Sequence, residues 1–423
     1  MKAILRLSLF PLAVELQTLS LFLLDGLANV IDFGFHFWMG RVLVPSEFAV
    51  LQTLNAVLLV YVTASGVFQP VVGRFVAEAR GRGEIMAIPA LFESFFCAAL
   101  WVGFGLGIIF FLLAAPIAQL LNLPKWTIQV SAALIFLGML RPVAVGVLQG
   151  QERFTLYGLS RLLTAAGRLL FAILFVMSGF GLYGAVAAFP LGWLAGVVAA
   201  FFFLGKSIWM KDSNFKGNHL REGWQLSAYA LVAYFAFMSL ASIDLVWVNR
   251  TLSGEAAGAY ASLVLLRRIV ALLPGAAVVV MFPRIAKTLA QGQLPDRLLS
   301  GTAMLILTAC GLLTGLYFLF SRQLVSLLFG EAYFAAVPLL GWMGFAMTGL
   351  SLSSIWLNFY LAHKPGSFVM LLLGSVILEG LLLNFLPPTM QNALIAFGTT
   401  GWLLFAGGLL LYLVKFRGEL AHA

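Results

Sequence analysis

The feature of this sequence that most constrains its fold is a series of long apolar runs separated by short polar loops. A helix needs about 20 mostly apolar residues to cross the hydrocarbon core of a bilayer. Twelve runs reach that length. The sequence therefore predicts an all-α polytopic membrane protein with twelve transmembrane helices, at 17–40, 48–72, 86–113, 127–148, 159–178, 181–204, 224–249, 257–281, 299–320, 335–361, 367–386 and 392–414.

The composition excludes a soluble globular protein. The chain is 62% hydrophobic and 10% charged, and its mean hydropathy is +1.02. Soluble domains are about 45–50% apolar and about 25% charged, so no soluble core could absorb this excess. Cys97 and Cys310 both lie inside apolar runs, which indicates small buried side chains rather than a disulfide or a metal site.

The basic residues predict the orientation of the chain in the membrane. The net charge of +9 indicates the Lys/Arg excess of cytoplasmic loops, and we expect no nucleic-acid partner. Of 25 basic residues, 17 lie at the two termini and in alternate loops, and only four lie in the other loops. Both termini are therefore predicted to be cytoplasmic. The remaining four lie within the apolar runs: Arg141, Arg168, Arg267 and Arg268.

The two halves of the chain resemble copies of each other. Ile31-Asp32 matches Ile243-Asp244 at an offset of 212, and two further pairs of segments match at offsets of 208 and 210. Six spans per copy give both halves the same orientation, related by an axis along the membrane normal around a central cavity. We therefore expect an N-terminal lobe at 1–204, a cytoplasmic linker at 205–223 and a C-terminal lobe at 224–423.

The first span carries a polar stripe formed by Asp25, Asn29, Asp32 and His36. Their spacing of four, three and four puts them on one face of a helix. A carboxylate near the bilayer centre costs about 2–3 kcal/mol or more, so the stripe must face other helices or a wet cavity. Two interpretations remain open. Asp25 or Asp32 could bind a coupling proton or Na⁺, or both could pair with arginines of the same lobe.

The arginines inside the spans are the strongest functional signal. Each costs about 2.5–3.5 kcal/mol at a helix centre, so each needs a compensating partner. The partners could be the acids that also lie in spans, which are Asp25, Asp32, Glu93, Asp244 and Glu379. Alternatively, the guanidinium groups could bind a diphosphate bidentately. Arg141, beside Pro142, is assigned a structural role. The substrate-binding candidates are Arg161, Arg168, Arg267 and Arg268, and the ion-coupling candidates are Asp25, Asp32, Asp244 and Glu379.

No motif of a soluble enzyme is recognisable. The segment Ala200–Ser207 approaches a phosphate-binding loop but lacks its first glycine. We therefore expect a transporter without a cofactor, a catalytic residue or a metal. It would either use a gradient, with H⁺ or Na⁺ as a possible coupling ion, or merely equilibrate its substrate. The pairs Gly103/Gly107 and Gly311/Gly315 predict close helix packing.

Two segments carry a family resemblance. Phe35–Leu51, with Gly40-Arg41 and Pro45-Ser46-Glu47-Phe48, and Arg74–Arg80 resemble the opening of polysaccharide and oligosaccharide-lipid flippases. These form the O-antigen-type branch of the multidrug/oligosaccharidyl-lipid/polysaccharide exporter superfamily. The chain departs from the family pattern at Val44 and Ala49, where the family has glycine. The resemblance implies a V-shaped pair of six-helix bundles that works by alternating access.

The resemblance also implies a function. A polyprenyl-diphosphate-linked oligosaccharide would move from the inner to the outer leaflet of a bacterial inner membrane, for cell-surface polysaccharide synthesis. Expected partners are the lipid-linked glycan, membrane lipids and a polysaccharide polymerase or glycosyltransferases, with the protein a monomer. The alternative is a multidrug or cation antiporter that exchanges at Asp32. A membrane glycosyltransferase would need long outer loops with catalytic groups, and the outer loops here are short.

Overall fold

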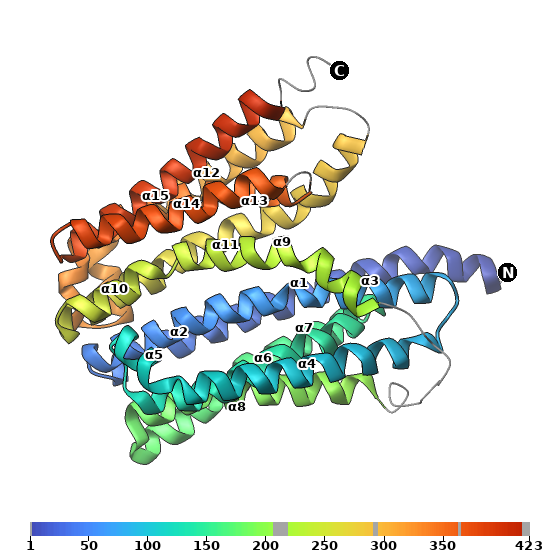
Figure 1. Ribbon diagram of the computed structural model, residues 1–423, viewed down its shortest axis with the longest axis horizontal. Helices are drawn as coiled ribbons and strands as arrows, with labels where there is room; N and C mark the ends of the chain where they lie inside the picture. Colours follow the sequence, from blue (N-terminus) through green and yellow to red (C-terminus); the bar gives the residue numbers. More distant parts are fainter. Residues whose placement is uncertain (1, 206–218, 291–294, 363–364, 417–423) are drawn as a thin grey trace. The chain divides into compact units, whose positions relative to one another are not determined.

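The computed structural model describes the backbone at 2–205, 219–290, 295–362 and 365–416. Side chains are described at 19–205, 228–272, 285, 295–361 and 366–414. In these residues the regular structure is entirely helical (Figure 1). The helices are α1 (Lys2–Val42), α2 (Pro45–Gly66), α3 (Phe68–Gly81), α4 (Ala87–Leu112), α5 (Ala114–Leu121), α6 (Lys125–Gly150), α7 (Phe154–Phe175), the π-helical turn η1 (Val176–Phe180), α8 (Gly181–Leu204), α9 (His219–Leu240), α10 (Ile243–Thr251), α11 (Gly254–Ala290), α12 (Asp296–Leu328), the 3₁₀ helix η3 (Glu331–Leu339), α13 (Leu340–Ala362), α14 (Pro365–Phe385), α15 (Met390–Leu411) and η4 (Tyr412–Phe416).

Every predicted span lies on helical structure, which confirms the all-α membrane fold. By length and hydropathy, nine stretches of the described chain could cross a membrane, or ten if the bent pair α9–α10 counts as one. One of the nine, Phe154–Leu204, has 51 residues, about twice the length that a single crossing needs. It contains α7 and α8, and the chain reverses between them at Gly179 and Gly181, whose φ angles are 89° and 47°. The count of twelve stays a prediction.

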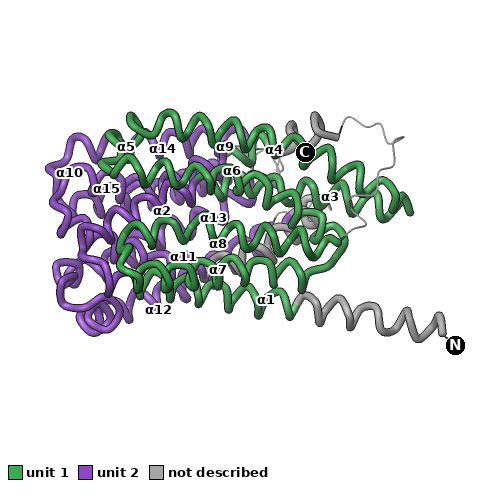
Figure 2. The backbone as a smooth tube through the Cα atoms, turned by 90° about the horizontal axis from the view of Figure 1, so that it is seen from below, with its two compact units in different colours: residues 1–39, 61–231 green, residues 40–60, 232–423 purple. Residues whose placement is uncertain are grey.

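The chain divides into two compact units (Figure 2). Unit 1 comprises 1–39 and 61–231, and unit 2 comprises 40–60 and 232–423. The predicted linker lies mostly outside the described residues, at 206–218. The predicted lobe boundaries at 204 and 224 stay a prediction, and the segment 40–60 belongs to the unit that contains the second half of the chain.

The hairpin between α1 and α2 packs within unit 2. The Arg41 guanidinium donates to the carbonyls of Ser326, Leu327 and Leu328, with its Nη2 3.1 Å from the first and its Nε 3.3 Å from the last. These are the last carbonyls of α12, which have no partner within their own helix, and a cation also suits the negative end of that helix. Phe48 adds an edge-to-face contact with Tyr333 at 5.7 Å between ring centroids. The segment that carries the family resemblance therefore builds this hairpin.

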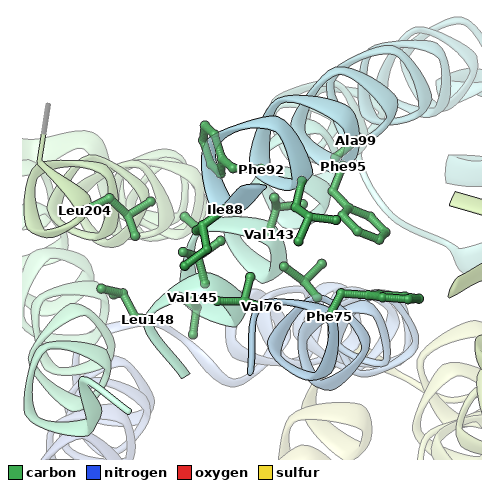
Figure 3. Close-up of a cluster of buried hydrophobic side chains, with 14 of the residues drawn as sticks. Phe75, Val76, Ile88, Phe92, Phe95, Ala99, Val143, Val145, Leu148 and Leu204 are labelled. Atoms are coloured by element: carbon green, nitrogen blue, oxygen red, sulfur yellow. The ribbon is translucent and has the colours of Figure 1, made fainter. Parts of the chain in front are cut away.

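Unit 1 has an apolar core between α3, α4 and α6 (Figure 3). Val76, Ile88, Phe92 and Val143 are each no more than 5% exposed there. In a membrane the close approach of helices depends on small residues, because lipid provides no hydrophobic drive for association. Gly146 is such a residue, since a Cβ there would lie 2.7 Å from the Gln69 carbonyl oxygen of α3.

We expect Gly146→Ala to lower the stability of the protein by about 1–3 kcal/mol, because the added methyl group meets backbone that cannot yield. Thermal unfolding in detergent measures the effect. Gly105→Ala is the matched control, since nothing lies within 4 Å of a Cβ at that helical position. That control should raise stability slightly through helix propensity. Equal shifts in both variants would contradict the packing argument.

Candidate functional site

The polar stripe of α1 faces α7, where two arginines meet it. Arg161 Nη1 lies 2.5 Å from Asp25 Oδ1, and its Nη2 donates to Asn29 Oδ1 at 2.8 Å. Arg168 Nη2 donates to Asp32 Oδ1. Asp25 and Asp32 are seven residues apart, as are Arg161 and Arg168. Because seven residues are nearly two helical turns, the two ion pairs lie one above the other along both helices.

The Arg168 side chain is enclosed by its neighbours, whereas the side chain of its partner Asp32 is exposed. Arg168 is 10% exposed, and its guanidinium carbon lies 4.8 Å from the ring centroid of Phe35 and 5.1 Å from that of Phe189. The Asp32 side chain is 43% exposed. The close packing of α8 against Arg168 requires glycine at position 192, since a Cβ at Gly192 would lie 2.6 Å from Arg168 Cβ. The fourth stripe residue, His36, is buried and lies next to Phe189.

Gly192→Ala should displace Arg168 and weaken its pair with Asp32. We expect a loss of about 1–3 kcal/mol in the free energy of unfolding, because the methyl group would overlap both the backbone and the side chain of α7. Thermal unfolding measures this loss. Gly34→Ala on α1 is the control, since it has no neighbour within 4 Å. Unchanged stability in the Gly192 variant would show that α8 can move away from α7 without cost.

A third arginine of unit 1 lies beside these pairs. Arg141, on α6, is within electrostatic range of Asp25, Asp32, Arg161 and Tyr157. Its guanidinium lies over the ring of Trp193 at 5.2 Å. Its Nε and Nη2 are buried and have no hydrogen-bond partner among the described residues. We call Asp25, Asn29, Asp32, Arg141, Arg161 and Arg168 the unit 1 charge cluster. It holds three guanidinium groups and two carboxyl groups.

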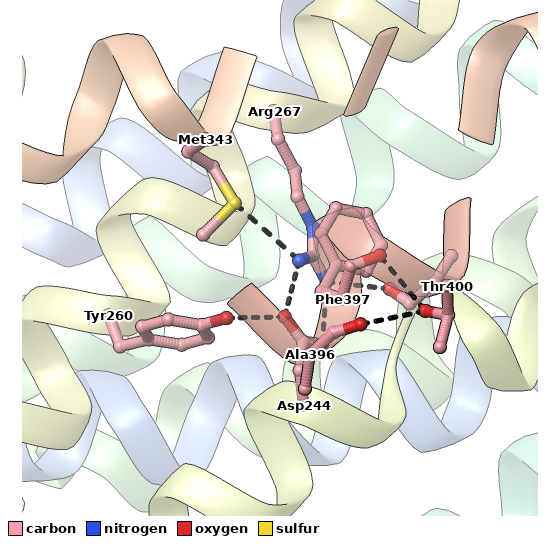
Figure 4. A network of polar contacts seen from close by, with 8 residues as sticks. Asp244, Tyr260, Arg267, Met343, Ala396, Phe397 and Thr400 are labelled. Atoms are coloured by element: carbon pink, nitrogen blue, oxygen red, sulfur yellow. Dashed lines mark hydrogen bonds and ion pairs between the residues drawn. The ribbon is translucent and has the colours of Figure 1, made fainter. Parts of the chain in front are cut away.

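Unit 2 contains a fully buried ion pair between Arg267 and Asp244 (Figure 4). Arg267 of α11 donates to both carboxylate oxygens of Asp244 on α10, with 2.8 Å between Nη2 and Oδ1. The Tyr260 hydroxyl donates to Asp244 Oδ2 at 2.6 Å. The Arg267 guanidinium also stacks over the Phe397 ring at 4.0 Å. Because the Arg267 side chain is only 2% exposed and that of Asp244 0%, this pair is closed to solvent.

A break between α9 and α10 sets the position of Asp244. The helices α9 and α10 are bent by 42° at the break between Leu240 and Ile243. Asp244 lies in the first turn of α10, where the helix dipole stabilises a negative charge. The break also frees the Ala241 carbonyl, which accepts from Arg267 Nη2 at 2.8 Å. Interrupted spans of this kind are where membrane transporters place ion and substrate sites.

Glu379 is the other acid of this region. It lies on α14, is 0% exposed, and both of its carboxyl oxygens are without a hydrogen-bond partner among the described residues. Asp244 and Arg267 are within its electrostatic range. Asp244, Tyr260, Arg267 and Glu379 form the unit 2 charge cluster. It holds one guanidinium group and two carboxyl groups.

The structure brings most of the candidate residues together in pairs. The pairing alternative is what is observed for Arg161 with Asp25, Arg168 with Asp32 and Arg267 with Asp244. Arg268 is partly buried, and Glu93 is exposed on α4. Roles of these residues in substrate binding and ion coupling stay predictions. Tyr260 was not predicted from the sequence, although it lies seven residues before Arg267 and therefore on the same helical face.

The fold and these buried charges define a polytopic membrane protein with charged side chains inside its spans. The chain belongs to the family of polysaccharide biosynthesis proteins, whose sequence profile matches residues 38–338. This match confirms the resemblance found at the first two spans. Among curated proteins, no sequence matches this chain.

Solved structures of the MOP superfamily share the fold. An inward-facing multidrug resistance MATE family transporter has a TM-score of 0.76 at 12% identity, over 94% of this chain and 95% of that chain. The lipid II flippase MurJ, in its inward closed conformation, has a TM-score of 0.69 at 13% identity, over 93% of this chain and 87% of that chain. A MOP superfamily transporter from Pyrococcus furiosus has a TM-score of 0.64 at 13% identity, over 96% and 94%.

Proposed function

We propose that this protein is a flippase that moves a polyprenyl-diphosphate-linked oligosaccharide from the inner to the outer leaflet. The observation that carries the proposal is the unit 1 charge cluster, in which three guanidinium groups face two carboxyl groups at membrane depth. A cluster with surplus positive charge suits an anionic head group. Membership of a polysaccharide biosynthesis family and the fold shared with a lipid flippase support the same substrate class.

The paired arginines retain donors for a ligand. A guanidinium group has five N–H bonds, and Arg161 donates to Asn29 and forms an ion pair with Asp25, which leaves other N–H groups for a ligand. Its side chain is 36% exposed, against 10% for Arg168 and 2% for Arg267, so Arg161 is more open to a phosphate than either of them. Arg168 would add positive charge within unit 1, and Arg268 is a separate candidate within unit 2. Arg267 is enclosed with Asp244, and it would contact substrate only if that pair opened.

The driving force would come from the membrane. An anion carried outward across a potential that is negative inside gains about 2.3 kcal/mol per charge per 100 mV. A proton or Na⁺ could add to this, with Asp25, Asp32, Asp244 and Glu379 as candidates. Glu379 is the strongest of the four, because each of the other three is bound to an arginine. The proposal includes a bacterial inner membrane, cytoplasmic termini and cooperation with glycosyltransferases or a polymerase.

Two variants of one ion pair test the proposal. Arg161→Gln removes positive charge from the cluster, whereas Asp25→Asn leaves the cluster more positive at the same side-chain size. A diphosphate-binding cluster should lose affinity in the first variant and keep or gain it in the second. A purely structural pair should suffer from both substitutions. The readout is protein-dependent flipping in liposomes of a labelled polyprenyl-diphosphate oligosaccharide, with the matching monophosphate lipid and an organic cation as comparison substrates.

Two outcomes would count against the flippase. Equal movement of all substrates would show an unselective protein, and movement of the organic cation alone would favour the antiporter. Flipping that does not change when the potential is reversed would reject the voltage-driven cycle. The antiporter would also need Asp32 to be free for exchange, whereas Asp32 is paired with Arg168.

A further inference from the structure

The Arg141 guanidinium has one edge, formed by Nε and Nη2, that receives no hydrogen-bond partner from the described residues. Its Nε–H and Nη2–H point in the same direction, and together they form the side of a guanidinium group that binds two oxygens at once. Both atoms are buried, and neither has a hydrogen-bond partner among the described residues. The Trp193 ring covers the face of the guanidinium but cannot satisfy its in-plane donors.

The acids that could complete this edge are bound elsewhere. Asp25 and Asp32 are within electrostatic range of Arg141, but they are paired with Arg161 and Arg168. Arg161 itself repels Arg141. Arg141 is therefore the guanidinium of this cluster that has no ion pair with a carboxyl group of the described residues.

An unmatched charge of this kind needs a reason. An arginine at a helix centre costs about 2.5–3.5 kcal/mol, and charges kept at membrane depth are usually functional. We propose that the Nε/Nη2 edge of Arg141 binds two oxygens of a phosphate group in the substrate head group. This inference rests on the proposed function and assigns the phosphate-binding role to a residue for which the sequence indicated only a structural role.

Phosphate is the chemistry that fits. The edge needs a ligand with two coplanar acceptor oxygens and a negative charge, and guanidinium binds phosphate in this bidentate manner. Arg161, which is within electrostatic range, would stabilise the same anion from the adjacent helix. The surplus positive charge of the cluster would then be compensated only in the loaded state.

The test compares Arg141→Met and Arg141→Lys in lipid nanodiscs of phosphatidylcholine. Titration calorimetry would measure binding of farnesyl diphosphate, farnesyl monophosphate, farnesol and inorganic diphosphate. We expect Arg141→Met to weaken diphosphate binding about ten- to hundredfold, the scale of a hydrogen-bonded charge pair. Arg141→Lys keeps the positive charge but lacks the two parallel N–H donors. Its affinity for diphosphate should therefore lie between those of the wild-type protein and Arg141→Met. Arg322→Met is the control, because Arg322 also lies 5.2 Å over an aromatic ring, that of Phe334, but is exposed.

Stability separates this role from a structural one. A residue that carries an unmatched buried charge should be replaceable by methionine with an unchanged or higher unfolding temperature. A lower unfolding temperature with unchanged affinity, failure of the methionine variant to fold, or no binding of any phosphate by the wild-type protein would each overturn the inference.

The outcome also separates this inference from the proposed function. Arg141-dependent binding of inorganic diphosphate without flipping of any lipid-linked glycan would support the phosphate site and reject the flippase. Binding of farnesyl monophosphate as tight as that of the diphosphate would identify a general phosphate-lipid site and keep the inference. Flipping by Arg141→Met with wild-type substrate dependence would reject the site and leave the flippase intact.

Discussion

Replacing Asp244 by alanine is expected to lower the free energy of unfolding by about 3–5 kcal/mol. That is the cost of removing one partner from a fully buried ion pair, because the other charge is left without compensation. Here the charge left without a partner would be that of Arg267, which is enclosed by Phe397 and Met343 as well as Asp244. The Tyr260 hydroxyl would lose its acceptor at the same time. Thermal or denaturant unfolding of the purified protein measures the loss.

The double variant Asp244→Leu/Arg267→Met is the decisive control. Replacing both members of a buried pair by apolar side chains of similar volume is often neutral or stabilising, so most of the loss should be recovered. If the double variant is stable but inactive in flipping, the pair serves transport rather than folding. A single variant as stable as the wild-type protein would show that the pair is open in solution.

Replacing Glu379 by glutamine is expected to abolish the pH dependence of transport. A carboxyl group that is 0% exposed and has no hydrogen-bond partner is costly as an anion, so we expect it to hold a proton when unit 2 is in the described conformation. Release of that proton requires access to water, which ties protonation to conformational change. Transport in liposomes across a pH series should flatten in the variant, with about a tenfold lower rate when a proton gradient is applied.

Chemical labelling tests the same claim without transport. A hydrophobic carbodiimide reacts with protonated carboxyl groups in apolar surroundings, and mass spectrometry locates the adduct. We expect labelling on the α14 peptide that disappears in Glu379→Gln. Glu84 is the control carboxyl group, because it is exposed in the loop between α3 and α4, outside the predicted spans, and should not be labelled. Absence of any adduct on Glu379 at low pH would contradict a protonated group.

The sequence predicted the fold well because membrane solvation leaves few alternatives. Runs of about 20 apolar residues must be helices in lipid, and each predicted run lies on helical structure. Packing detail was harder to predict. Gly103 and Gly107 do contact α6 closely, but among the described residues nothing lies within 4 Å of a Cβ at Gly311 or Gly315, so these residues do not show the close packing predicted there. The spacing of the glycines shows that one helix face carries small residues, but it does not show which helix packs against that face.

For the candidate site, the sequence identified residues but could not choose their partners. The spacing of Asp25 and Asp32 predicted a common face, and the structure places that face against α7. Whether an arginine meets a carboxylate or a ligand depends on contacts between helices distant in the sequence. For the same reason Arg141 could be recognised as the unpaired member only after its neighbours were located.

Arg168 and Glu379 are 211 positions apart, within the offsets of 208 to 212 that relate the two predicted copies. If the predicted copies correspond at this offset, that position carries a base in one copy and an acid in the other, while Asp32 and Asp244 both keep their acid. A helical scaffold repeated in this way could reverse the charge of one half by a single substitution at that position. Selection could then retune which charged molecules the protein accepts while leaving helix packing unaltered.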